Sequence, residues 1–172
     1  YKPMTSALVL LGAEMCDAMS YRHQLSHFSR KCPVTIGPTV TDHRLDKLAL
    51  DLLTHLPPRF ALFGHGLGAH LAMEIVRQGS RRVERACLLN ATALAEAPGA
   101  AAAREPRIVS ANSGRLEDAL REMMHTHQLA QSPARPGHLN AFLESACAMG
   151  PETFVAQMRA LQRRRDQQAT MR

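Results

Sequence analysis

The sequence has few aromatic side chains and no long apolar run. Phenylalanine, tyrosine and tryptophan make up only 4% of the 172 residues, and tryptophan is absent. No apolar stretch approaches the roughly 20 residues that a membrane-spanning helix needs, and the apolar residues 7–11 are too few for a signal peptide. These absences predict no membrane span, no removable leader and a location in the cytoplasm.

Metal-type spacing is also missing. The four cysteines are spread along the chain at Cys16, Cys32, Cys87 and Cys147. Without close pairs, they are expected to be reduced thiols. His125 and His127, with His138 further on, are the other metal candidates, but the i, i+2 spacing puts two rings on different faces of a helix. We therefore expect surface histidines, no bound metal and no cofactor.

The chain is basic, with a net charge of +6 and a pI near 9.7. Eight of the 18 arginines fall into two groups, around residues 77–85 and 159–165. Such charge can attract phosphate backbones, but the low aromatic content and the lack of a nucleic-acid-binding motif favour solvated helix faces and ends. We expect no nucleic-acid partner.

The first half of the sequence alternates apolar strands with helical patterns. Strands are predicted at residues 8–11, 34–36, 60–64 and 86–90. A helix is predicted over 21–30, and Thr41 or Asp42 is suited to cap a second helix that ends at Pro57. Alternating strands and helices predict an α/β fold with a parallel sheet and helices on its faces.

The second half is alanine-rich and then helical. A hinge is predicted near residues 93–103, followed by helices at 104–113, 116–125, 137–149 and 152–164. Breaks are expected at Gly114, at Pro133 and at Gly150 with Pro151. The chain therefore divides into an α/β core over 1–95 and a helical cap over 96–172, although its length suits a single core.

Residues 64–68 read Gly-His-Gly-Leu-Gly and connect an apolar strand to an apolar helix. This spacing is typical of a nucleophile elbow, the sharp G-x-S-x-G turn that exposes a catalytic serine, but Gly66 stands at the serine position. We expect a positive φ at Gly66. The alternative interpretation is an ordinary strand-to-helix crossover, because glycines alone are a weak signal.

With these features assembled, the chain resembles small bacterial α/β-hydrolases related to carboxylesterases. The resemblance covers nearly the whole chain and is most specific over residues 60–90. The segments that carry it are Leu8–Gly12 with Met15–Ala18, Gly64–Gly68, Glu74–Gln78, Arg82–Arg85, Leu88–Asn90 and Phe154–Ala160. They look like the family's oxyanion loop, elbow, elbow helix, following strand and last cap helix.

The resemblance implies ester or thioester hydrolysis by a serine at the position of Gly66. The backbone N–H groups of Ala13 and Leu67 would then hold the developing oxyanion. It also implies that the catalytic Asp and His follow two further strands, which lie beyond Arg172. The chain is thus expected to correspond to the first two thirds of such a hydrolase and to be inactive as it stands.

Four further residues are predicted to line the pocket: Glu14, Met15, Cys16 and His65. Cys16 is the best substitute nucleophile, although a structural role is favoured because no base accompanies it. His65 is interpreted as a core histidine. For Glu14 and Asp17, substrate orientation or helix N-capping is favoured over acid–base catalysis.

Two functional hypotheses remain from the sequence. In the first, the chain is an incomplete or inactivated ester-cleaving α/β-hydrolase. In the second, it is a non-catalytic protein that holds a small acyl or ester ligand or serves as a scaffold. The strand at 86–90 is expected to be an open sheet edge through which the chain self-associates.

Overall fold

Four parallel strands form one sheet in the computed structural model, which describes residues 6–124 and 131–172. The strands are β1 (Ala7–Leu11), β2 (Val34–Ile36), β3 (Phe60–His65) and β4 (Val83–Leu89). Their order across the sheet is β2-β1-β3-β4, with Val9 opposite Leu62 in the central pair. All four predicted strands are confirmed, and β4 begins at Val83 rather than at residue 86.

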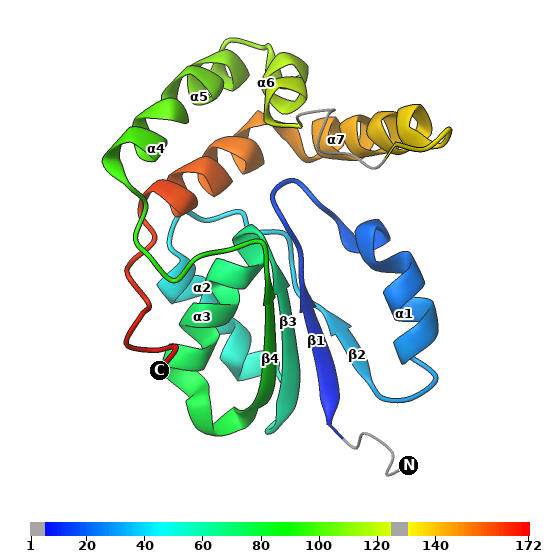
Figure 1. Ribbon diagram of the computed structural model, residues 1–172, viewed down its shortest axis with the longest axis vertical. Coiled ribbons are helices and arrows are strands. Elements are labelled where there is room, and N and C mark those ends of the chain that lie inside the picture. Colours follow the sequence, from blue (N-terminus) through cyan, green and yellow to red (C-terminus); the bar gives the residue numbers. More distant parts are fainter. Residues whose placement is uncertain (1–5, 125–130) are drawn as a thin grey trace.

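Helices cover both faces of this sheet. Two short 3₁₀ helices are η1 (Ala18–Tyr21) and η2 (Ser80–Arg82), and the α-helices are α1 (Arg22–Phe28), α2 (Leu45–His55), α3 (Leu67–Gly79), α4 (Pro98–Ala103), α5 (Glu105–Asn112), α6 (Leu116–Met123) and α7 (Arg135–Gln162). Helices α2 and α3 pack on one face, and α1 lies on the other (Figure 1). The sequence therefore predicts the α/β class correctly, because buried parallel strands read as continuous apolar runs.

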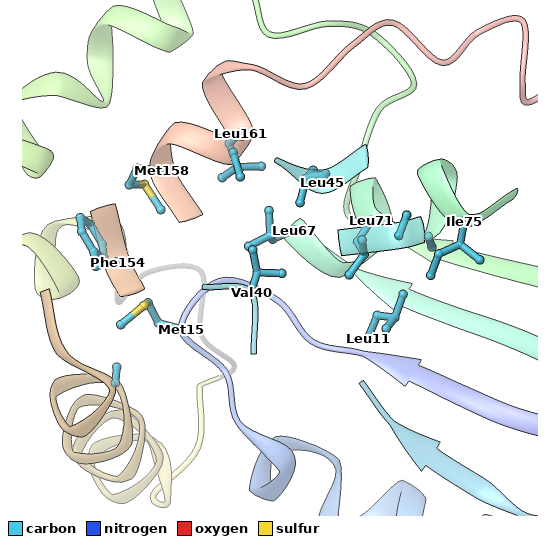
Figure 2. Close-up of a cluster of buried hydrophobic side chains, with 14 of the residues drawn as sticks. Leu11, Met15, Val40, Leu45, Leu67, Leu71, Ile75, Phe154, Met158 and Leu161 are labelled. Carbon is cyan, nitrogen blue, oxygen red and sulfur yellow. The ribbon is translucent and has the colours of Figure 1, made fainter. Parts of the chain in front are cut away.

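One apolar cluster joins the sheet to the helices of the second half. Figure 2 shows Leu11, Leu67 and Leu71 from the sheet side together with Phe154 and Leu161 from α7. A smaller cluster under α1 contains Leu8, Leu10, Tyr21, Cys32 and Ala61. Burial of each such side chain stabilises the folded state by about 1.5–3 kcal/mol. The position of α7 is therefore fixed by the same core that holds the sheet.

Helices α4 to α7 form a cap beside the carboxyl ends of the strands (Figure 1). Helix α7 is kinked at Gly150, where φ is 84° and Pro151 follows. This kink confirms the predicted break. It forms because proline removes a helical hydrogen bond and glycine alone adopts this φ without strain. The division at residue 95 stays a prediction.

Two local predictions differ from the structure. The segment predicted as a hinge near 93–103 contains helix α4, because Pro98 is suited to a first helical position and alanines favour helix. Neither Thr41 nor Asp42 caps α2. That helix begins at Leu45, and Asp42 instead accepts a hydrogen bond from the backbone N–H of Arg44 at 2.9 Å.

The histidine pair at 125 and 127 lies outside the described residues, whereas His138 is exposed as expected. Within residues 6–124 and 131–172, no three potential metal ligands gather. None of the helices described there has the length and apolar character needed to cross a bilayer.

Strand β4 is the edge of the described sheet, and much of its surface is open. Cys87 is exposed, and 51% of Leu89 is accessible. The exposure of Cys87 agrees with the open sheet edge that the sequence predicts at this strand. Its apolar character reflects an edge that is uncovered in the described chain, and self-association through residues 86–90 stays a prediction.

Candidate functional site

The turn from β3 to α3 has the backbone of an elbow. Gly66 adopts φ 55° and ψ −121° between the last strand residue, His65, and the first helical residue, Leu67. The predicted positive φ is confirmed. At Gly64, an added Cβ would lie only 2.6 Å from the Cα of Ala69, so strand and helix pass too closely for any larger residue.

The carboxylate of Glu14 fills the space that a side chain at position 66 would occupy. Its Oε2 accepts a hydrogen bond from the backbone N–H of Leu67 at 3.2 Å. The same oxygen lies 2.5 Å from the position of a Cβ built on Gly66, and the Cβ of Ala13 lies 3.2 Å from it. Glu14 reaches this place from the loop after β1, so it replaces the missing side chain from a different element.

The four residues Ala13, Glu14, Gly66 and Leu67 are thus brought together as the sequence predicts. Their chemistry differs from the expectation in one respect. The N–H of Leu67, predicted to hold an oxyanion, already donates to Glu14. A negative carboxylate at the first turn of a helix is stabilised by the helix dipole, which agrees with the N-capping interpretation of Glu14.

Three other predicted site residues lie elsewhere. Met15 does not line any cavity beside Gly66. Its side chain is fully buried in the core, and its backbone has φ 53°. Cys16 borders a separate small cavity of about 20 Å³, and burial raises the pKa of its thiol. His65, next to Gly66 in the chain, is half-buried and is not among the residues that line the cavity beside Gly66.

Of the two roles predicted for Asp17, substrate orientation or helix N-capping, the structure shows the N-cap of η1. The Oδ1 of Asp17 accepts from the N–H of Met19 at 2.9 Å, and its Oδ2 accepts from the hydroxyl of Ser145 on α7 at 2.6 Å. Gln157, also on α7, makes a second bridge. Its Oε1 accepts from Met15 N–H at 2.8 Å, and its Nε2 donates to the carbonyl of Val40 at 3.0 Å. The cap therefore holds the loop that carries Glu14.

A cavity of about 460 Å³ opens beside Glu14 and Gly66. The remaining residues that line it are His70, Asn90, Ala91, Thr92, Glu96, Arg104, Leu161 and Arg164. They come from the carboxyl ends of the strands, from α3 and from the cap. This is the edge of a parallel sheet where ligands bind in open α/β folds.

Two arginines and one glutamate form the cap side of this cavity. Glu96 is nearly buried and makes ion pairs with both Arg104, at 3.3 Å, and Arg164. The side chains of Arg104 and Arg164 are 19% and 12% exposed. The sequence-based assignment of the second arginine group to a solvated face is therefore wrong for Arg164.

His70 lies one helical turn after Gly66 and is buried. Burial, reinforced by Arg164 and Arg104, lowers the pKa of His70 to about 4. The imidazole is therefore neutral at pH 7 and adds hydrogen-bonding groups to the cavity without adding charge. Its i, i+4 spacing from Gly66 was the signal that would have placed it on this face.

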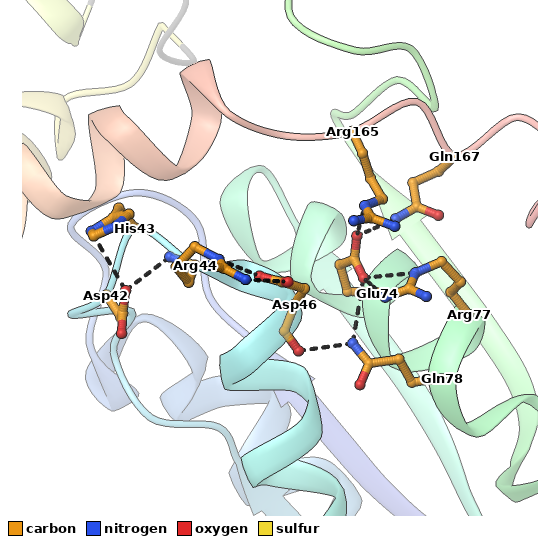
Figure 3. Close-up of polar contacts among 9 residues, drawn as sticks. All are labelled: Asp42, His43, Arg44, Asp46, Glu74, Arg77, Gln78, Arg165 and Gln167. Carbon is orange, nitrogen blue, oxygen red and sulfur yellow. Dashed lines mark hydrogen bonds and ion pairs between the residues drawn. The ribbon is translucent and has the colours of Figure 1, made fainter.

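A second cavity of about 260 Å³ shares His70 and Arg164 with the first. Next to it, the buried carboxylate of Glu74 binds Arg77 at 2.8 Å and the amide of Gln167 at 2.6 Å (Figure 3). Arg165 pairs with the same carboxylate at 3.3 Å. These contacts tie the segment after α7 back to α3, so we assign them a structural role.

Solved structures with similar folds are hydrolases. A carboxylesterase from the ammonia-oxidizing thaumarchaeon Nitrososphaera gargenis matches with a TM-score of 0.78 and 15% identity, over 95% of this chain and 66% of that one. A thermophilic esterase from Thermogutta terrifontis matches with a TM-score of 0.75 and 18% identity, over 94% of this chain and 65% of that one. A type II thioesterase from the borrelidin biosynthetic cluster matches with a TM-score of 0.60 and 19% identity, over 95% of this chain and 67% of that one.

These matches show that the chain has the α/β-hydrolase fold and that it spans about two thirds of the length of the first two proteins. No protein-family model and no curated protein matches the sequence.

Proposed function

We propose that this chain is an α/β-hydrolase relative that binds a small organic molecule at the elbow without hydrolysing it. The observation that carries the proposal is the replacement of the nucleophile by Gly66 together with the placement of the Glu14 carboxylate in the vacated space. The ligand site is the cavity of about 460 Å³, a volume within the usual range of small-molecule sites, about 300–1,000 Å³.

Ester or thioester hydrolysis, which the matched enzymes suggest, requires an attacking group and donors for the oxyanion. Gly66 has no side chain, and the N–H of Leu67 is taken by an acceptor. A carboxylate here also repels the negative charge that develops on a carbonyl oxygen during attack. Two features of the site therefore oppose acyl transfer: the missing nucleophile at Gly66 and the carboxylate of Glu14 at the oxyanion position.

Cys16 is not a substitute nucleophile. Burial raises the pKa of its thiol, and the nearby carboxylates of Glu14 and Asp17 act in the same direction, although a hydrogen bond with Ser20 partly opposes them. The reactive thiolate is therefore rare at neutral pH. The cysteine also borders the small neighbouring cavity rather than the one beside Gly66.

The proposal is tested by measuring hydrolysis of p-nitrophenyl acetate, p-nitrophenyl butyrate and a short acyl thioester. The expected rate equals that of the heat-unfolded protein at the same concentration. Gly66→Ser alone is also expected to stay at this background, because one hydroxyl without a base supplies little catalysis. A saturable rate that survives repurification would refute the proposal, and its loss on Cys16→Ala would identify the attacking group.

A further inference from the structure

The cavity beside Gly66 carries opposite charges at its two ends. At the elbow end, Glu14 presents a carboxylate whose one hydrogen bond within the described residues comes from Leu67 N–H. At the cap end, Arg104 and Arg164 share the single carboxylate of Glu96. The cap end thus holds two guanidinium groups and one carboxylate, because His70 is neutral at pH 7, and the other carboxylate that acts electrostatically on Arg164 is that of Glu14 at the elbow end.

Arg104 is also short of hydrogen-bond acceptors. Its Nη2 reaches Glu96 only at 3.3 Å and 3.4 Å, and its Nη1 faces the thioether of Met158 at 3.6 Å, which is a weak acceptor. Its Nε is a buried side-chain polar atom that finds no partner within the described chain. An unsatisfied guanidinium beside a cavity indicates that an anionic group of a ligand completes it.

The elbow end selects the opposite chemistry. Glu14 accepts hydrogen bonds at the place where a hydrolase offers donors to a carbonyl oxygen. A ligand group that approaches Glu14 and Gly66 is therefore favoured when it donates hydrogen bonds or carries a positive charge. An ester carbonyl placed there meets a like-signed partner and loses its hydration without compensation.

We propose that this cavity binds a small zwitterion, with its ammonium group at Glu14 and its carboxylate at Arg104 and Arg164. The proposal rests on the ligand-binding function above and deepens it by naming the ligand class. Recognition at both ends uses charge-assisted hydrogen bonds, which are the stronger ones in proteins. The polar groups of Asn90 and Thr92 line the remaining wall.

The test is a calorimetric titration of the whole chain with ω-amino acids of increasing length: glycine, 4-aminobutanoate and 6-aminohexanoate. The matched singly charged probes are butanoate and butylamine, and the neutral probe is methyl butanoate. We expect one member of the series to bind at least about tenfold more tightly than either singly charged probe, because each charge-assisted contact contributes roughly tenfold or more.

Single substitutions separate the two ends. Glu14→Gln keeps an acceptor for Leu67 N–H and removes the charge, so it is expected to weaken zwitterion and butylamine binding about tenfold and to leave butanoate unchanged or tighter. Arg104→Gln is expected to weaken zwitterion and butanoate binding by a similar factor and to leave butylamine unchanged. Arg163→Gln is the control, because Arg163 is exposed and borders the other cavity.

Folding of each variant is checked by circular dichroism, and Arg104→Lys replaces Arg104→Gln if the latter unfolds. If no ω-amino acid exceeds both singly charged probes, or if Arg163→Gln weakens binding as much as Arg104→Gln, the zwitterion assignment is wrong. Tighter binding of methyl butanoate without turnover overturns that assignment and leaves the ligand-binding function standing. Binding of none of the probes overturns both, and hydrolysis of the ester overturns the non-hydrolytic function.

Discussion

Replacement of Gly66 by serine is expected to destabilise the protein through two separable effects. The first is backbone strain, because a residue with a Cβ is held at φ 55° and ψ −121°. Such conformations cost about 1–3 kcal/mol. The second is displacement of Glu14, whose Oε2 would lie 2.5 Å from the new Cβ. The hydrogen bond from Leu67 N–H to Glu14 contributes a net stability of about 1–2 kcal/mol, because both groups bond to water when the protein unfolds.

The sum is a loss of about 2–5 kcal/mol in the free energy of unfolding. For a chain of 172 residues, this corresponds to a fall in melting temperature of roughly 5–15 °C. Urea denaturation followed by circular dichroism measures the loss. Gly99→Ala is the matched control, because a Cβ at Gly99 meets nothing within 4 Å, and its stability is expected to change by less than about 1 kcal/mol.

A double-mutant cycle isolates the contribution of the carboxylate. In a Glu14→Ala background, Gly66→Ser has no carboxylate to displace, so only the strain remains and its cost falls by about 1–2 kcal/mol. Equal losses in both backgrounds would show that Glu14 does not occupy the space beside Gly66. A serine variant as stable as the parent would refute the strained turn itself.

Three further predictions concern other parts of the chain. His70 has a pKa lowered from 6.5 to about 4 by burial and two nearby arginines, so the stability from its neutral form is present above about pH 6.5 and is lost as the pH falls toward 4. His70→Gln should reduce the pH dependence of urea unfolding over this range by about 2–3 kcal/mol. Cys87 is exposed and is expected to react with a disulfide reagent before the half-buried Cys16, whose thiol pKa is raised by burial, and Cys87→Ser should remove the fast phase. We also propose that the open edge of β4 mediates self-association, so Leu89→Lys should lower the sedimentation coefficient of concentrated samples, and no change with concentration in the parent would contradict this.

The sequence was sufficient for the sheet and the elbow because both depend on local patterns. Apolar runs predicted the strands, and the spacing of glycines predicted the positive φ at Gly66. The alternative of an ordinary crossover loses support, because φ, ψ and the close approach at Gly64 all match a strained turn. These features need no knowledge of distant side chains.

The composition of the cavity was beyond sequence reasoning because it depends on contacts between distant segments. Arg104 and Arg164 meet Glu96 only after the cap folds back over the strands, and nothing in their spacing indicates this. Met15 was predicted to line the pocket, but a positive φ in its loop turns the side chain into the core. The loop position of Glu14 was recognised, whereas its occupation of the elbow follows from the missing side chain at Gly66.

The bridge made by Gln157 sets how a ligand exchanges with the cavity. This one amide holds the N–H of Met15 and the carbonyl of Val40, and it is almost fully buried. Lifting α7 would leave all of these groups without partners, at a cost of about 1–3 kcal/mol for each. The cap helices therefore stay in place over the sheet, and small molecules enter and leave the cavity through its permanent opening without movement of the cap. Amide exchange at Met15 should accordingly be as slow with an empty cavity as with a filled one.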